Sequence, residues 1–174
     1  LVSLDFREKA PKLSFESMFL DEEGNYVRDL ALFSHISSGV PGTVNGLIKI
    51  YNDYGSGKFT LTELLQPAIN LADNGFAIEP TAAQGFDTNK SHFIKDEGSK
   101  KLFIKNNDNV ITDLESKFSN GELSSEEYEK MLNEIDEWKP GDIFIQKDLA
   151  NTLRRIAKSG NKGFYEGETA QYII

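Results

Sequence analysis

The residues best suited to chemistry are the charged group Asp5-Phe6-Arg7-Glu8 near the start of the chain. Arginine presents a planar fork of donors and stays protonated at any relevant pH. At the end of a strand and inside a cleft, Arg7 would be suited to capturing a carboxylate through two parallel hydrogen bonds. An internal salt bridge to Asp5, Glu8 or another neighbour would serve structure instead, and the residue types alone favour that interpretation.

Other candidate sites are weaker. The loop over 38–43 has two glycines but lacks the lysine and the spacing of a phosphate-binding loop. His35 and His92 lie far apart with no cysteine partner, so a zinc site is not expected, and His35 beside Ser34 lacks the third member of a triad. Acidic pairs fall in polar segments, where paired carboxyl groups with a raised pKa are not expected. The residues alone therefore predict no nucleophile with its base and no metal site.

Composition narrows the class of protein. The chain has 174 residues, 39% of them hydrophobic and 27% charged, which predicts a soluble globular domain. A formal net charge of −9 argues against nucleic-acid binding, which needs a clustered basic face. The lack of cysteine excludes disulfides, thiolate metal sites and a cysteine nucleophile.

The element predicted to carry Arg7 is a strand over residues 1–8. Val2, Leu4 and Phe6 alternate with polar residues, the period of a half-buried strand. Such a strand needs partners, and little else in the chain can pair with it. We therefore expect a piece of a longer protein, in which 1–8 belongs to the parent sheet. In the isolated chain this strand would pair with a second copy or fray.

Helical periodicity dominates the remainder, with about six to seven helices expected. Thr43 is predicted to cap a helix with Val44, Leu47 and Ile48 on its apolar face. Thr62 begins a second helix, with Pro67 near its first turn and a stop at Gly75. The fold class is thus α+β and predominantly helical, with one leading strand.

We divide the single domain, residues 1–174, into four parts. After the strand come a helical part over 9–105, a polar insertion over 106–139 and a second helical part over 140–174. The insertion is predicted to be one helical hairpin on the surface, because Ser124 and Glu127 have the spacing of a capping box.

Several short motifs follow one another in a fixed order along nearly the whole chain. They are Leu4-Asp-Phe-Arg-Glu8, Gly39-Val-Pro-Gly42, Tyr54-Gly55, Leu65-Gln-Pro67-Ala68, Gly141-Asp142, Asp148-Leu149-Ala150, Ile156-Ala157 and Phe164-Tyr165-x-Gly167. This succession resembles the γ-glutamyltranspeptidases, specifically an internal stretch of their large subunit. The region 106–138 departs from the family by being longer and more polar.

The resemblance implies part of a four-layer αββα sandwich of the N-terminal-nucleophile type. Its members are precursors that cut themselves into a large and a small subunit, and the new N-terminal threonine of the small subunit attacks a γ-glutamyl amide such as glutathione. Water, an amino acid or a peptide then takes the acyl group. By motif match Arg7 binds the α-carboxylate of the glutamyl group and Glu8 supports the pocket, which reverses the structural interpretation of Arg7.

The same resemblance implies what the chain lacks. The nucleophile and its supporting groups belong to the small subunit, and no threonine here lies at the family's cleavage motif, including Thr43, Thr60, Thr62 and Thr152. The isolated chain is therefore expected to be inactive, and its partners are the remainder of the large subunit and the small subunit. No metal or organic cofactor and no nucleic acid is expected. A periplasmic or secreted bacterial location follows from the resemblance alone.

Alternatives remain open at this point. A relative that depolymerises poly-γ-glutamate or deacylates a β-lactam side chain would share these motifs. A non-enzymatic helical binding module that keeps the family's scaffold is another class, and so is an acidic adaptor that recruits a partner through the insertion over 106–138.

Overall fold

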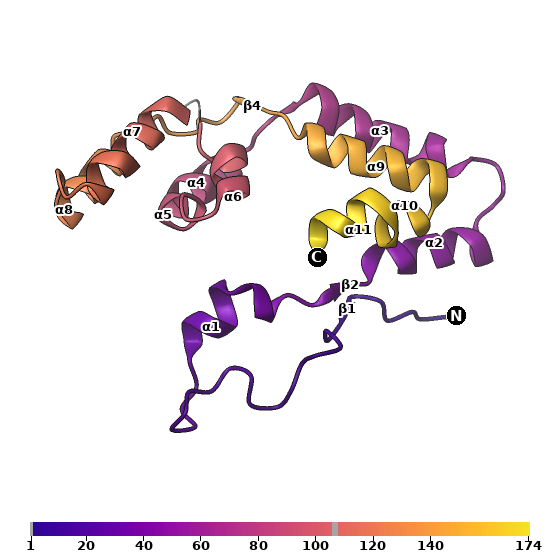
Figure 1. The fold of residues 1–174 in the computed structure, drawn as a ribbon. Helices are drawn as coiled ribbons and strands as arrows, with labels where there is room; N and C mark the ends of the chain where they lie inside the picture. The colour runs from indigo at the N-terminus through magenta and orange to yellow at the C-terminus, as the bar shows by residue number, and fades with distance from the viewer. Residues whose placement is uncertain (1, 106–107) are drawn as a thin grey trace. The chain divides into compact units, whose positions relative to one another are not determined.

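The structure is a computed structural model that describes residues 2–105 and 108–174. These residues group into two compact units (Figure 1). One consists of Leu1–Gln66 with Thr152–Ile174, and the other of Pro67–Asn151. The fold is predominantly helical with a few short strands, as the sequence predicted. The described residues form eleven α-helices rather than six or seven. The number is larger because several helices are short, in places where the sequence predicted one longer helix or irregular chain.

The first unit carries the Arg7 segment. Its elements are β1 (Glu8–Lys9), α1 (Arg28–Phe33), the 3-10 turn η1 (His35–Ser37), β2 (Val40–Pro41), α2 (Thr43–Tyr54), the first part of α3 (Leu61–Asn74), the last part of α9 (Lys147–Ser159), α10 (Lys162–Tyr165) and α11 (Gly167–Ile173).

The leading strand is shorter and later than predicted. β1 pairs with β2 in an antiparallel ladder of two residues each, and residues 2–6 have no regular secondary structure. Leu4 and Phe6 are nevertheless half-buried between exposed polar neighbours, so the predicted alternation persists there. A strand requires a neighbour for its backbone N–H and C=O groups, and the described chain offers one only at β1. Leu1 lies outside the described residues, and a longer strand in a parent sheet stays a prediction.

Two helix starts differ from the sequence prediction. Thr43 is the first residue of α2, and the capping position belongs to Gly42, which has no side chain to offer. α3 begins at Leu61 rather than Thr62. Thr60 precedes it in a reciprocal cap, because its backbone N–H donates to Glu63 Oε2 at 2.7 Å while the Glu63 N–H donates to Thr60 Oγ1 at 3.2 Å. The starts were misplaced because several neighbouring residues suit a cap equally well.

The second unit contains the polar stretch. Its elements are the remainder of α3, β3 (Phe76–Ala77), α4 (Pro80–Thr88), α5 (Lys90–Phe93), α6 (Glu97–Phe103), α7 (Asp108–Ser119), α8 (Ser125–Asn133), β4 (Ile143–Phe144) and the start of α9. β3 and β4 pair antiparallel. None of the helices in the described part of the chain is both long and apolar enough to span a bilayer.

The stretch over 106–139 forms the hairpin of α7 and α8, with 106–107 outside the described residues. The capping box of Ser124 and Glu127 is present. The hairpin also holds much of the unit's apolar core, which the polar composition did not suggest. Ile111 and Leu114 are 1% and 2% exposed and cluster with four other buried side chains, Ile94, Ile104, Leu132 and Ile135. The hairpin is therefore anchored by apolar packing.

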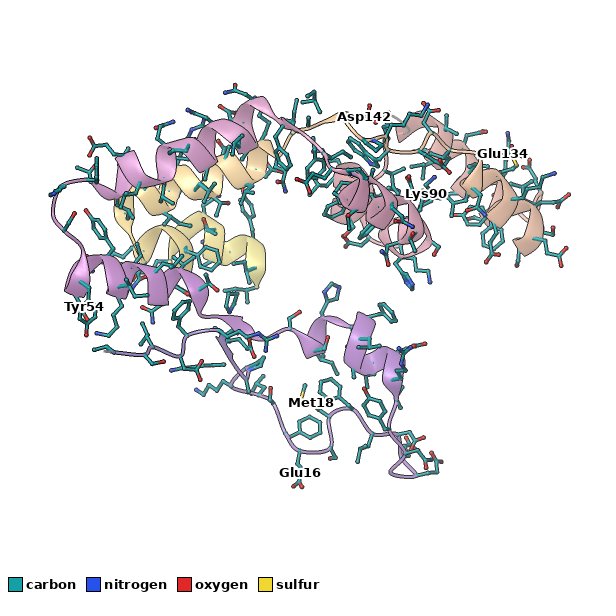
Figure 2. All side chains as sticks on the ribbon, turned by 180° about the vertical axis from the view of Figure 1, so that it is seen from behind. Glu16, Met18, Tyr54, Lys90, Glu134 and Asp142 are labelled. Carbon is teal, nitrogen blue, oxygen red and sulfur yellow. The ribbon has the colours of Figure 1, made fainter. Side chains whose placement is uncertain are left out.

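An ion pair closes the turn before β4 and gives a prediction about acid stability. Lys105 Nζ donates to Asp142 Oδ2 at 2.6 Å, and the Lys139 N–H donates to the same oxygen at 2.7 Å. Asp142 is labelled in Figure 2. These bonds lower the pKa of Asp142 below its usual range, the Lys105 bond most of all. A carboxyl group with a lowered folded pKa stabilises the fold above its unfolded pKa of about 3.9, and that contribution is lost as pH falls through the folded pKa.

We therefore expect Asp142→Asn to lower the urea midpoint at pH 7, and the gap to wild type to close as the pH falls from 7 to below the unfolded pKa of about 3.9. Urea unfolding followed by circular dichroism across this range measures it. Asp136→Asn, which alters an exposed aspartate of the preceding loop, is the matched control for the loss of one carboxyl group. A gap that stays constant on acidification would contradict the assignment.

Candidate functional site

Arg7 and Glu8 border a hollow of about 620 Å³ beside β1 and β2. Its lining includes the charged residues Arg7, Glu8 and Lys9 and the apolar residues Met18, Phe19 and Ile36. Met18 is labelled in Figure 2, in the irregular segment between β1 and α1. A hollow lined by both an arginine and apolar residues suits a carboxylate attached to a short aliphatic chain.

The Arg7 side chain is available for a ligand. It is 86% exposed, and among the described residues its guanidinium contacts the carboxylate of Glu8, with Nη1 at 2.8 Å from Oε1. The structure thus brings the two predicted site residues together. An exposed ion pair between neighbours adds little stability. Since an arginine has five N–H donors, most of them remain free to receive a carboxylate in the bidentate geometry.

The backbone of Arg7 is held much more firmly than its side chain. The Gly42 N–H donates to the Arg7 carbonyl at 3.1 Å. The Phe6 ring covers Gly46 so closely that a Cβ there would lie 2.1 Å from the ring, and a Cβ on Gly42 would lie 2.1 Å from the Phe6 carbonyl oxygen. No side chain fits at either glycine. The glycine-containing loop that resembled a weak phosphate site in the sequence is therefore a cradle for the segment that carries Arg7.

Sequence reasoning missed Tyr165. Its hydroxyl, at the end of α10, donates to the Pro41 carbonyl at 2.6 Å and accepts the Asn45 N–H at 3.2 Å. Asn45 is the third residue of α2, and its N–H has no partner within the helix. The cap predicted for Thr43 is thus supplied by a side chain about 120 residues away. The only sequence signal was the Phe164-Tyr165-x-Gly167 motif, which does not predict the hydrogen-bond partners of the hydroxyl.

The histidines and serine weighed earlier form no catalytic group. Ser34 Oγ donates to the Leu30 carbonyl, and His35 lines a neighbouring apolar hollow of about 250 Å³. Within residues 2–105 and 108–174, no group of three His, Cys, Asp or Glu side chains is placed to hold a metal ion.

The hydroxyls of Thr60, Thr62 and Thr152 form hydrogen bonds within the first unit. Thr60 Oγ1 donates to Glu63 at 2.8 Å, Thr62 Oγ1 to the Ala157 carbonyl at 3.4 Å, and Thr152 Oγ1 accepts from Arg155 at 3.0 Å. None of these contacts places an amine or imidazole beside the hydroxyl as a general base.

Comparisons with known proteins point to one family. The family model described as gamma-glutamyltranspeptidase matches residues 1–174. A crystal structure of gamma-glutamyltranspeptidase from Helicobacter pylori superposes with a TM-score of 0.75 at 38% identity, covering 97% of this chain and 40% of that one.

Two curated relatives show the same relationship. The glutathione hydrolase proenzyme of Pseudomonas sp. (strain A14) is 34% identical over 171 residues, which are 98% of this chain and 25% of the relative. The capsule biosynthesis protein CapD proenzyme of Bacillus anthracis is 35% identical over 135 residues, 78% of this chain and 20% of the relative. The chain therefore spans about a quarter of the length of such relatives or less, and its fold matches part of the structure of these enzymes. Since the family model spans residues 1–174, this chain belongs to the γ-glutamyltranspeptidase family.

Proposed function

We propose that this chain is part of the large subunit of a γ-glutamyltransferase and glutathione hydrolase. The complete enzyme cleaves γ-glutamyl amides such as glutathione and passes the γ-glutamyl group to water, an amino acid or a peptide. The observation that carries the proposal is Arg7, whose backbone is fixed by the glycine cradle while its guanidinium is exposed beside a hollow. The family membership supplies the class of reaction.

In this proposal Arg7 receives the α-carboxylate of the glutamyl group through two parallel hydrogen bonds. Glu8 accepts from the opposite part of the guanidinium and holds the plane of the fork in place. Both residues act in binding, and the chain supplies no catalytic residue. Neither a metal nor a cofactor is proposed for it.

The chemistry belongs to the N-terminal threonine of the small subunit. Its hydroxyl oxygen attacks the γ-carbonyl carbon while its own α-amine takes the proton. The C–N bond of the amide breaks, the leaving amine departs with a proton, and an ester-linked acyl-enzyme remains. Water or the amine of an acceptor then attacks the ester and regenerates the threonine.

The proposed partners are the remainder of the large subunit, the small subunit and a γ-glutamyl compound. In the complete enzyme the whole chain forms part of one domain of the αββα sandwich, with 1–8 as a strand of the parent sheet. A periplasmic or secreted location is proposed by analogy with bacterial relatives. In the absence of its partners the chain is proposed to dimerise through its unpaired leading segment.

A second candidate within the family has its own support. The capsule biosynthesis relative is as similar to this chain, over 135 residues, as the glutathione hydrolase relative is over 171. This likeness favours a longer γ-linked glutamate polymer as an alternative donor. Arg7 would have the same role, because each such residue also carries a free α-carboxylate.

One assay tests the proposal. The complete, processed protein is expected to release the chromophore from a γ-glutamyl anilide, and a dipeptide acceptor is expected to increase the rate. Release of glutamate from glutathione and shortening of poly-γ-glutamate, measured in parallel, distinguish the two candidates. A processed protein that cleaves neither donor would contradict both.

A further inference from the structure

Tyr165 closes the turn between β2 and α2 from outside that turn. Through its one hydroxyl it engages both sides of the turn, the Pro41 carbonyl on one and the Asn45 N–H on the other. A hydroxyl has one donor and two acceptor positions, so both bonds form at once. A single oxygen atom, the Tyr165 hydroxyl, therefore restrains the distance between the Pro41 carbonyl and the Asn45 N–H.

The position of that oxygen is itself well determined. Gly163 lets α10 lie directly on the backbone of α9, since a Cβ there would be 2.1 Å from the Arg155 carbonyl oxygen. Asn161 Nδ2 donates to Asn45 Oδ1 at 2.8 Å and forms a second tie to α2. The Phe164 ring meets the Tyr165 ring edge-on, with centroids 5.0 Å apart. The hydroxyl is thus presented by a packed element.

The turn that Tyr165 closes is the one that holds Arg7. Gly42, between Pro41 and Asn45, donates its N–H to the Arg7 carbonyl, and Gly46 lies under the Phe6 ring. β2, which ends at Pro41, pairs with β1 immediately after Arg7. A shift of this turn would therefore move the backbone from which the guanidinium projects, and a misplacement of about 1 Å is costly in a binding site.

We infer that Tyr165 is a positioning residue for the carboxylate-binding guanidinium of Arg7. This inference rests on the proposed function of Arg7. A purely structural cap would cost stability without a selective effect on substrate binding. A positioning role requires weaker binding of the glutamyl donor with a nearly unchanged rate of chemistry, because the carboxylate lies away from the reacting carbonyl.

The test is Tyr165→Phe in the complete, processed enzyme with a γ-glutamyl anilide as donor. We expect KM to rise about three- to tenfold, the worth of one or two hydrogen bonds, while kcat changes by less than about twofold. Tyr51→Phe is the matched control. It removes a hydroxyl that donates to the Phe59 carbonyl at 3.2 Å near the other end of α2, and its KM should equal that of wild type. Thermal melting of both variants measures the stability cost.

Combining Tyr165→Phe with Arg7→Gln identifies the route of the effect. If Tyr165 acts through Arg7, its removal has no further effect once the guanidinium is absent. A raised KM for Arg7→Gln with an unchanged KM for Tyr165→Phe overturns this inference alone, and so does an equal effect of Tyr165→Phe in both backgrounds. An unchanged KM for Arg7→Gln overturns the proposed function and this inference with it.

Discussion

Replacing Arg7 by glutamine in the complete, processed enzyme is expected to raise KM for γ-glutamyl donors about 100-fold with little change in kcat. Two charge-assisted hydrogen bonds to a carboxylate are lost, and together they are worth about 3 kcal/mol. The α-carboxylate keeps the same charge in substrate and transition state, so its contact contributes uniform binding. Initial-rate kinetics with a γ-glutamyl anilide measure both constants.

Two further variants sharpen this test. Arg7→Lys keeps the charge but loses the planar fork, and an intermediate KM is expected. Lys12→Gln removes a cation five positions along the chain and should leave KM unaltered. The fold should tolerate Arg7→Gln, because the side chain is 86% exposed and its partner Glu8 is left in contact with water. A glutamine variant with a wild-type KM would contradict the binding role.

The isolated chain of residues 1–174 is expected to show no turnover of γ-glutamyl donors above a buffer control. Loss of a nucleophile costs at least about four orders of magnitude in rate, because the positioning groups that remain have nothing to position. Within the described residues the hydroxyls of Thr60, Thr62 and Thr152 form hydrogen bonds to a carboxylate, a backbone carbonyl and an arginine, and none of these contacts supplies the amine that an N-terminal nucleophile uses as its base. Anilide release by the purified chain, at a concentration matched to the complete enzyme, measures the loss.

Two controls make a negative result meaningful. Circular dichroism and proteolysis must show that the isolated chain is folded, since an unfolded chain would also be inactive. Arg7→Gln in the isolated chain should leave the background unchanged. Activity that co-purifies with the chain and falls on Arg7→Gln would show that the chain carries its own nucleophile.

The local features of this fold followed from the sequence. The capping box of Ser124 and Glu127 and the left-handed Gly75 after α3 depend on residues within a few positions of one another. Nearby residues meet whatever the rest of the chain does, so spacing alone predicts them. The family and the predicted role of Arg7 came from ordered motifs. The family model confirms the family over residues 1–174, and the role of Arg7 stays a prediction.

Features that depend on distant parts of the chain were missed or misjudged. Leu47 was expected to face inward with the apolar side of α2, yet it is 55% exposed. The polar composition of 106–139 gave no indication of the apolar core around Ile111 and Leu114. Composition counts residues, while burial depends on which face another element covers.

By itself, the sequence determined the helical character and the family, and it predicted the pair Arg7 and Glu8 as a binding site. Only the tertiary structure decided how that pair is held, because the Phe6 ring on Gly46 and the Tyr165 hydroxyl on Pro41 join segments about 40 and 120 residues apart. Such contacts arise from packing in three dimensions, and no periodic pattern of residues in the sequence predicts them.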